Sequence, residues 1–570
     1  MPYRAAADEI RFLLETVCGF DSLREAAGEE ALAPDVLAAI LDEAASLCNE
    51  VIAPLQRVGD LQPPVIENGV VRASPGFGEA YRAYAEGGWV GMLGKEEYGG
   101  MNLPVSVAMG VHDMLAGACM SFQLQPLLTQ AQIGALEAHA SDALKALYLP
   151  KLTSGEWAGT MNLTEPQAGS DLGALRTKAE PGSEGTYRVS GQKIYISWGD
   201  SDMTDNIVHL VLARLPDAPA GTKGLSLFLV PKFLPDASGG PGPRNGVRVV
   251  SLEHKLGLHG SPTAVMEFDG ATGWLVGHEN GGIEAMFTMM NEARLGTGMQ
   301  GVGVGEAAYQ HAAAFAADRK QGKTGGETGA IHEFADVRRM LVWMRARVTA
   351  ARAVALSCAT ALDMAAVTGS AQWQARAAFL TPIAKAFSTQ VGIDVAQMGI
   401  QVHGGMGVIE ETGAAQYLRD VRVSAIYEGT NGIQSVDLVG RKMRDGGEAA
   451  LALIDEIEGG AEAARATRAD LAGAVWEAAE TLREATEWMA GQPEPVERFA
   501  GALPYLQAFG LVLGAHFHLR AAMSEAEPGP RTALARAFIR RQLPEHVGLL
   551  AEATVGATDL FDVTPEALGI

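Results

Sequence analysis

The chain has 570 residues, 48% of them hydrophobic, so it can bury more than one core and is long enough for three or four domains. Its 44 Lys and Arg against 68 Asp and Glu give a formal charge of −24, which opposes binding to a nucleic-acid backbone. The four cysteines lie far apart in the sequence, and the first residues lack the layout of a signal peptide. The most apolar C-terminal stretch, 503–517, is shorter than the roughly 20 residues needed to span a membrane. We therefore expect a reduced, cytoplasmic protein without nucleic-acid or membrane partners.

The spacing of apolar residues changes along the chain. Helical spacing over residues 1–156 predicts a helical domain, and short apolar runs separated by Gly, Pro, Asp and Ser predict a β domain over 157–277. Long Ala-rich helical segments return over 278–443. Residues 444–570 are helical again and are interrupted by the loop compositions GQPEPVE and AEPGPR. The predicted fold is mainly α, with a central β domain and an additional C-terminal helical domain.

Two motifs lie in the predicted β domain. In MNLTEPQAGSDLGALRTKA, residues 161–179, hydroxyls and glycines are suited to binding a flat heterocycle and its phosphates, although a helix-to-strand connection with Ser-Asp turn chemistry explains the same composition. In GQKIYISWGD, residues 191–200, Tyr195 and Ser197 are two apart in a predicted strand and so share one face. Each motif alone is also compatible with ordinary structure.

Two glycine-rich motifs lie in the second helical region. GTGMQG, residues 296–301, has the spacing of a dinucleotide-binding fingerprint, but the sequence before it has helical periodicity where a strand is required. We interpret it as a glycine-rich packed helix. QVHGGMG, residues 401–407, either lies against a pyrophosphate or caps a helix. His403 has no second ligand at metal-binding spacing, so we expect no metal site.

A single carboxylate, Glu428, interrupts the apolar, small and neutral residues of AIYEGTNGIQ, residues 425–434. This segment follows TEPQAGSD, GQKIYIS, KLGLHGSPT and QVHGGMG, and in that order the motifs make residues 80–440 resemble the acyl-CoA dehydrogenase family. The resemblance implies an N-terminal helical domain, a middle β-barrel and a C-terminal four-helix bundle, with the C-terminal helical domain as an addition. It also implies FAD as cofactor, an acyl-CoA substrate and an electron-transfer flavoprotein as electron acceptor.

The resemblance implies that Glu428 is the catalytic base, which removes a proton from Cα of the thioester while a hydride leaves Cβ. Exclusion of water should raise its pKa, and hydrogen bonds from its backbone N–H and a flavin hydroxyl should stabilise the enolate. Some family branches carry the base immediately before the residue matching Arg294, but Ala293 stands there and Glu292 is one position off. The implied cofactor contacts are Met161, Leu163, Thr164, Ser170, Tyr195, Ser197, Arg319, Gln401, Gly404, Gly405 and Thr430. The implied substrate contacts are Ser170, Asn291, Arg294 and Gly429.

In the family, the elements matching Arg319 and 401–405 reach the FAD of a neighbouring subunit, but the usual motif at Arg319 is shortened here to RKQG. The added helices favour a homodimer. The layout resembles members that act on 3-(methylthio)propanoyl-CoA; a medium- or long-chain fatty acyl-CoA dehydrogenase is one alternative. A second alternative is a DNA-associated flavoprotein of this fold, which would need a basic C-terminal surface, whereas residues 441–570 hold 12 basic against 20 acidic residues. We expect the arginine-rich helical pattern at 533–543 to be a solvated face.

Overall fold

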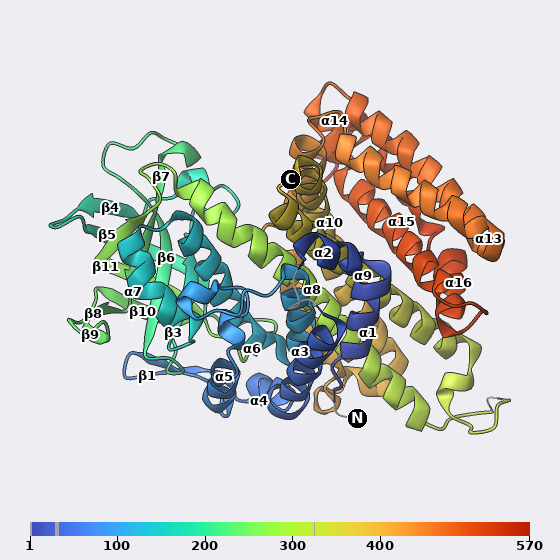
Figure 1. The fold of residues 1–570 in the computed structure, drawn as a ribbon, viewed down its shortest axis with the longest axis horizontal. Helices are drawn as coiled ribbons and strands as arrows, with labels where there is room; N and C mark the ends of the chain where they lie inside the picture. Colours follow the sequence, from blue (N-terminus) through green and yellow to red (C-terminus); the bar gives the residue numbers. More distant parts are fainter. Residues whose placement is uncertain (1–2, 29–32, 324) are drawn as a thin grey trace. The chain divides into compact units, whose positions relative to one another are not determined.

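The computed structural model describes residues 3–28, 33–323 and 325–570 (Figure 1). Its contacts define two compact units: unit 1 comprises Met1–Ala45, Val105–Gly117 and Arg294–Ile570, and unit 2 comprises Ser46–Pro104 and Ala118–Ala293. The division falls within two long helices, α6 (Val105–His139) and α8 (Gly282–Asp318). In α6 it coincides with a break in helical geometry at Cys119 (φ −161°, ψ 98°).

Unit 2 is built around a seven-stranded sheet. Its strands are β3 (Trp157–Asn162), β4 (Lys178–Pro181), β5 (Tyr187–Ser197), β6 (Asn206–Arg214), β7 (Leu225–Pro231), β10 (Val247–Leu252) and β11 (Thr263–Val276). The pairings form a circuit from β11 through β5, β4, β6 and β7 back to β11, in which a single residue pair, Lys178 and Arg214, joins β4 to β6. Hairpins β1 (Val65–Glu67) with β2 (Val70–Arg72) and β8 (Phe233–Pro235) with β9 (Pro241–Arg244) lie outside this sheet.

Side-chain alternation along the strands separates two hydrophobic cores in unit 2. On β6, Val208, Leu210 and Leu212 join a core with α6 and α7 (Asp142–Thr153), whereas Val211 and Ala213 belong to a core made from strands. Because successive strand residues point to opposite faces, a strand with a core on each face is apolar throughout. Shorter helices α4 (Leu55–Leu61) and α5 (Phe77–Glu86) complete the unit.

Unit 1 is helical. Its N-terminal helices are α1 (Ala7–Phe12), α2 (Phe20–Ala27) and α3 (Pro34–Leu47), the last of which ends just past the unit boundary. The central helices are α8, α9 (Ala335–Thr368), α10 (Ala371–His403), α11 (Ala414–Val421) and α12 (Asn431–Asp437). A Cβ at Gly301 of α8 would lie 2.2 Å from the Ser388 carbonyl oxygen, so the helices approach more closely there than an alanine would allow. The prediction of a glycine-rich packed helix at 296–301 is confirmed.

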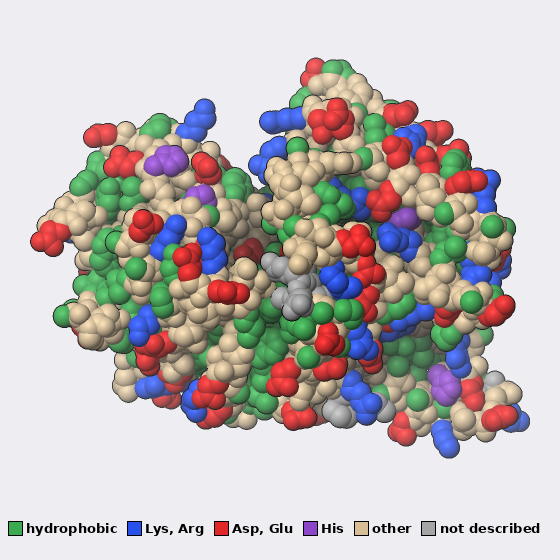
Figure 2. All heavy atoms as spheres, in the orientation of Figure 1, with side chains coloured by type: hydrophobic (Ala, Val, Ile, Leu, Met, Phe, Trp, Pro, Cys, Tyr) green, Lys and Arg blue, Asp and Glu red, His purple; other side chains and the backbone are tan. Residues whose placement is uncertain are grey.

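The C-terminal extension comprises α13 (Glu448–Gly491), α14 (Pro495–Ala500), α15 (Ala502–Met523), α16 (Pro530–Arg541), α17 (Glu545–Ala553) and α18 (Thr558–Asp562). Helix α15 packs beside α13 and also contacts α9, α10, α16 and α17 (Figure 1). This central position explains why α15 is apolar around most of its circumference. On the face drawn in Figure 2, acidic and basic side chains are interspersed over the extension.

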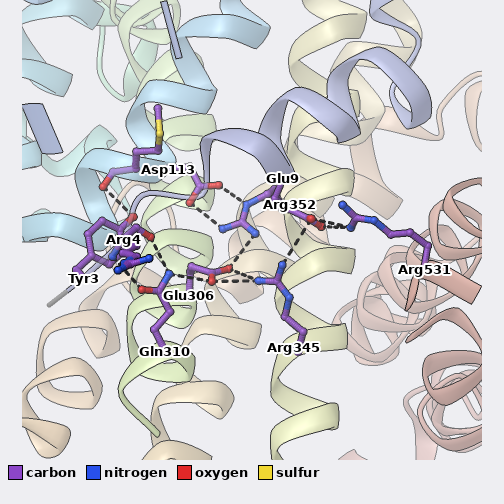
Figure 3. Close-up of polar contacts among 10 residues, drawn as sticks. Tyr3, Arg4, Glu9, Asp113, Glu306, Gln310, Arg345, Arg352 and Arg531 are labelled. Carbon is purple, nitrogen blue, oxygen red and sulfur yellow. Dashed lines mark hydrogen bonds and ion pairs between the residues drawn. The ribbon is translucent and has the colours of Figure 1, made fainter. Parts of the chain in front are cut away.

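A buried ionic cluster joins the N-terminal helix to the helical core of unit 1. Arg352, which is fully buried in α9, donates from Nε to Asp113 Oδ2 at 2.5 Å and from Nη1 to Glu306 Oε2 at 3.0 Å (Figure 3). Arg345 also pairs with Glu306, at 2.9 Å, and lies 3.5 Å from Glu9 of α1. Arg531 of α16 reaches the same Glu9 at 2.6 Å. The cluster therefore links α1, α6, α8, α9 and the extension.

Among the described residues, two helices are long and apolar enough to cross a membrane, Val105–His139 and Ala335–Thr368. In their most apolar windows, 94% and 78% of the residues are buried inside the protein. Such burial is typical of the core helices of a globular domain.

Candidate active site

Glu428 lies in the turn that leads into α12. Its φ is +55° and that of Gly429 is +85°, so two consecutive residues adopt the left-handed conformation. For a non-glycine residue this conformation costs about 1–3 kcal/mol, so other contacts must hold Glu428 in place. The φ of +85° at Gly429 favours glycine, and a Cβ there would also force the end of the Gln434 side chain, 2.5 Å away, to move.

Three side chains hold the carbonyl groups of this turn. Arg294 Nε of α8 and Gln434 Nε2 of α12 donate to the Glu428 carbonyl oxygen, at 3.2 and 3.4 Å. Lys385 Nζ of α10 donates to the Gly429 carbonyl oxygen at 2.9 Å. The turn is thus fixed from three helices, two of which contribute a cationic side chain.

The surroundings of the half-buried Glu428 side chain change its acidity. Burial raises the pKa of Glu428 to about 7, although Arg294 and Lys385 both act to lower it. Burial likewise lowers the pKa of Lys385 to about 7, against the influence of Glu428. The Glu428 pKa is therefore raised, as expected. A carboxyl group that titrates near neutral pH is suited to act as a general base.

A second group of predicted residues meets in unit 2. The Ile194 backbone N–H donates to the Thr164 carbonyl oxygen at 2.9 Å, which places the segment after β3 beside the end of β5. Tyr195 has a φ of +61° and is 61% exposed, and the β5 register shifts opposite it. This bulge interrupts the alternation from which Tyr195 and Ser197 were expected to share a face. It presents the Tyr195 ring on the surface of unit 2, one residue after Ile194, whose backbone bonds to the partly exposed Thr164.

A buried ion pair attaches this segment to the sheet. Lys193 Nζ donates to the Leu163 carbonyl oxygen at 2.8 Å and to Glu165 Oε1 at 2.9 Å, and the two charged side chains are 0% and 4% exposed. The Glu165 carboxylate also accepts from the backbone N–H groups of Arg176 at 2.8 Å and Thr177 at 3.0 Å. Burial opposes ionisation of Glu165, but Lys193 and these donors prevail and lower its pKa to about 2.

The glycine-rich segment after α10 and the residues after α8 are open to solvent. Gly404 has a φ of +59° and caps α10, a position that leaves its backbone exposed and also compatible with contact to a pyrophosphate. A Cβ at Gly404 or Gly405 would meet nothing within 4 Å, and Gln401 is exposed. Arg319 follows α8 directly and donates to Gln321 Oε1 at 2.8 Å.

The predicted site residues therefore fall into groups within each unit. In unit 1, the base turn brings together Arg294, Glu428, Gly429 and Thr430, whose hydroxyl caps α12 by accepting from Ile433 N at 3.1 Å. In unit 2, the end of β3 and the segment after it lie beside the end of β5, which brings together Met161, Leu163, Thr164, Tyr195 and Ser197. Ser170 and Asn291 are exposed in unit 2. Sequence reasoning missed Lys193, Glu165 and Lys385; for Lys385 the available signal was a charge inside the apolar and small run PIAKAF.

Glu292, one position from the alternative base, belongs to unit 2. It faces Gly134 of α6, where a Cβ would lie 3.1 Å from Glu292 Oε2. Burial, followed by the nearby charge of Glu137, raises its pKa to about 8. Glu292 is therefore the other carboxyl group against which the role of Glu428 as the base must be tested.

The residues present fit a flavin dinucleotide. In unit 2, the exposed Tyr195 ring and the partly exposed Thr164 suit a flat polar heterocycle. In unit 1, Gly404 and Gly405, where a Cβ would meet nothing within 4 Å, allow the backbone to approach a pyrophosphate.

Comparison with known proteins identifies the family. The chain matches models of the acyl-CoA dehydrogenase N-terminal domain (36–156), middle domain (160–271) and C-terminal domain (280–443). A fourth model, acetyl-CoA dehydrogenase C-terminal like, matches 453–564. The chain belongs to the acyl-CoA dehydrogenase family and is a flavin-dependent oxidoreductase with FAD as its cofactor.

Relatives include the 3-methylmercaptopropionyl-CoA dehydrogenase of Ruegeria pomeroyi, 45% identical over 545 residues that cover 92% of each chain. A butyryl-CoA dehydrogenase of Syntrophomonas wolfei is 37% identical and covers 71% of this chain and 69% of its own. Among solved structures, Caenorhabditis elegans ACDH-11 in complex with C11-CoA has a TM-score of 0.79 at 19% identity and covers 97% of this chain and 96% of its own. The structural likeness shows the acyl-CoA dehydrogenase fold, mostly helical with a sheet domain and an added C-terminal region.

Proposed function

We propose that this acyl-CoA dehydrogenase oxidises 3-(methylthio)propanoyl-CoA to 3-(methylthio)acryloyl-CoA, with Glu428 as the base. The substrate is supported by the 45% identity to the Ruegeria pomeroyi enzyme, which extends over 92% of both chains and so includes most of the extension. The role of Glu428 is supported by one observation above all: a carboxyl group with a pKa of about 7 is held in a left-handed turn by contacts from three helices.

Bound FAD supplies a hydride acceptor, and the residues of the chain carry out the proton chemistry. Glu428 must be ionised to accept the proton from Cα of the thioester, and it becomes neutral when it does so. Burial makes the carboxylate a stronger base than a glutamate in water, while Arg294 and Lys385 keep part of the population ionised near neutral pH. The Glu428 backbone N–H is proposed to donate to the thioester oxygen, where one such donor is worth about 3 kcal/mol.

The cofactor contacts are part of the same proposal. Thr164, Tyr195 and Ser197 are assigned to the isoalloxazine ring, supported by their proximity in unit 2 and by the exposed Tyr195 ring. Arg319 and the glycines at 404 and 405 are assigned to the dinucleotide of a second subunit in a homodimer. An electron-transfer flavoprotein is the proposed acceptor and the cytoplasm the proposed location. The closed circuit of strand pairings supports the proposal that the sheet forms a β-barrel.

Glu428→Gln tests the base. The variant should bind FAD and acyl-CoA, but anaerobic addition of substrate should reduce the flavin about 10²–10⁴-fold more slowly, the range attributed to a general base. The matched control is Glu292→Gln, which removes another buried carboxyl group with a raised pKa and should reduce at a rate close to that of the unsubstituted protein. Rapid bleaching of Glu428→Gln together with slow bleaching of Glu292→Gln would move the base to position 292.

A panel of acyl-CoA thioesters tests the substrate. 3-(Methylthio)propanoyl-CoA should bleach the flavin at least as fast as butanoyl-CoA, since a methylene-sized difference is worth only about 1–3 kcal/mol in a pocket. Faster reduction by medium- or long-chain thioesters would favour the β-oxidation alternative. Failure of every thioester together with salt-sensitive retention on DNA would favour the DNA-associated alternative.

A further inference from the structure

Lys385 is a buried lysine that contacts the turn carrying Glu428. It is 0% exposed in α10, within the otherwise apolar and small sequence PIAKAF. Its Nζ donates to two neutral oxygens, the Gly429 carbonyl oxygen at 2.9 Å and Asn431 Oδ1 at 3.0 Å. Lysine is rarely fully buried, so a position of this kind calls for a specific reason.

One turn of α10 and the first residue of α12 form the environment of this ammonium group. Asn431 Oδ1 also accepts from Thr389 Oγ1 at 3.2 Å, and Asn431 Nδ2 donates to the Ala386 carbonyl oxygen at 3.3 Å. The Asn431 side chain is thereby held in one orientation, with its oxygen toward Lys385. The ammonium group is fixed between this oxygen and the carbonyl group directly after Glu428.

A neutral donor would satisfy the Gly429 carbonyl group equally well, but a cation also acts on the carboxylate. The charged and titratable groups that face Glu428 are Arg294 from α8, Lys385 from α10 and Tyr427 from its own segment. Farther out, Asp437 and Arg441 act on Arg294. An ammonium group among these partners favours the ionised form of the carboxyl group.

We propose that Lys385 is a positioning residue for the reaction: its Nζ holds the Glu428–Gly429 turn, and its protonated form favours the ionised form of Glu428. The inference rests on the proposed role of Glu428 as the base. Arg294 and Lys385 have different contacts in this turn: Arg294 donates to the carbonyl oxygen of Glu428, and Lys385 donates to the carbonyl oxygen of Gly429.

The test compares Lys385→Met with Thr389→Val. The first removes the charge at similar length, and the second removes a neutral hydrogen bond to the same Asn431 oxygen. FAD content is measured first, followed by the pH dependence of anaerobic flavin reduction by acyl-CoA. A second readout that does not depend on turnover is the infrared carboxyl band of Glu428, identified by its absence in Glu428→Gln and followed against pH.

In Lys385→Met, the pH midpoint of flavin reduction and the pH midpoint of the Glu428 carboxyl band should both rise, because the variant lacks a cation that acts to lower the Glu428 pKa. In Thr389→Val they should stay at the values of the unsubstituted protein. Unmoved midpoints overturn the inference, and so does a loss of rate that is equal at every pH, because that result indicates a structural role alone. If Lys385→Met does not fold, Lys385→Gln keeps a hydrogen-bond donor at this position without the charge and should shift both midpoints in the same direction.

The outcomes separate this inference from the proposed function. If the unsubstituted protein is not bleached by any acyl-CoA, the proposed function fails, while the infrared titration still reports the effect of Lys385 on Glu428. If the unsubstituted protein is bleached and Lys385→Met keeps the same midpoints, the proposed function stands and the inference about Lys385 fails.

Discussion

Replacing Lys193 with methionine tests how the predicted flavin-lining segment is held. The substitution keeps most of the side-chain volume but leaves Glu165, which is 4% exposed, without its cation. It also removes the donor to the Leu163 carbonyl oxygen at 2.8 Å. Residues 163–165 should then be attached to β5 less firmly, through the backbone hydrogen bond from Ile194 N–H to the Thr164 carbonyl oxygen without the two from Lys193.

The size of the effect follows from burial. Burial lowers the pKa of Lys193 to about 8 although Glu165 acts to raise it, whereas the pKa of Glu165 falls to about 2. The folded protein thus disfavours the charged form of Lys193 and favours the charged form of Glu165, so the intact pair contributes little to the free energy of unfolding. Removing one partner is different, because the remaining buried charge is uncompensated, and such losses are about 3–5 kcal/mol.

The assay is urea unfolding near pH 7, with the FAD dissociation constant measured in parallel. The matched control is Lys178→Met, which breaks the exposed pair of Lys178 and Glu180 at 3.2 Å, with side chains 62% and 43% exposed, and should change stability by less than about 1 kcal/mol. The loss in Lys193→Met should shrink in acid, because protonated Glu165 no longer carries an uncompensated charge. A loss no greater than that of the control, with unchanged FAD affinity, would refute this reasoning.

Three further predictions concern other parts of the molecule. The rate of flavin reduction should rise with pH through about 7, because burial raises the Glu428 pKa to that value and only the ionised carboxylate accepts a proton; a stopped-flow pH series checks this. Arg352→Met should lower the free energy of unfolding by about 3–5 kcal/mol in urea titrations, because the fully buried guanidinium compensates two buried carboxylates; a loss below about 1 kcal/mol would contradict it. Gly301→Ala should destabilise by about 1–3 kcal/mol, because its Cβ would lie 2.2 Å from a backbone oxygen. Gly459→Ala, in α13 with nothing within 4 Å, should be neutral or stabilising by up to about 1 kcal/mol in the same thermal denaturation.

Periodicity and motif order along the chain were enough to predict the family, the cofactor and the succession of helical and strand regions. The segment 296–301 shows why local pattern was sufficient: helical spacing before GTGMQG excluded a strand, and α8 runs through it. Glu428 was recognisable because a single acid in an apolar, small-residue segment is unusual and four other motifs accompany it.

Other features depend on residues far apart in the chain and could not be read from local pattern. Strand alternation predicted a shared face for Tyr195 and Ser197, but the bulge that exposes Tyr195 arises from pairing with β11. Lys385 meets the turn of Glu428 only because α10 passes beneath it, and the pKa of each group depends on that burial and pairing. The sequence thus determined which chemical groups are present and the local structure in which they lie. The tertiary fold decided which charged groups are buried and which partners they contact, because desolvation and Coulomb interactions depend on distances in space.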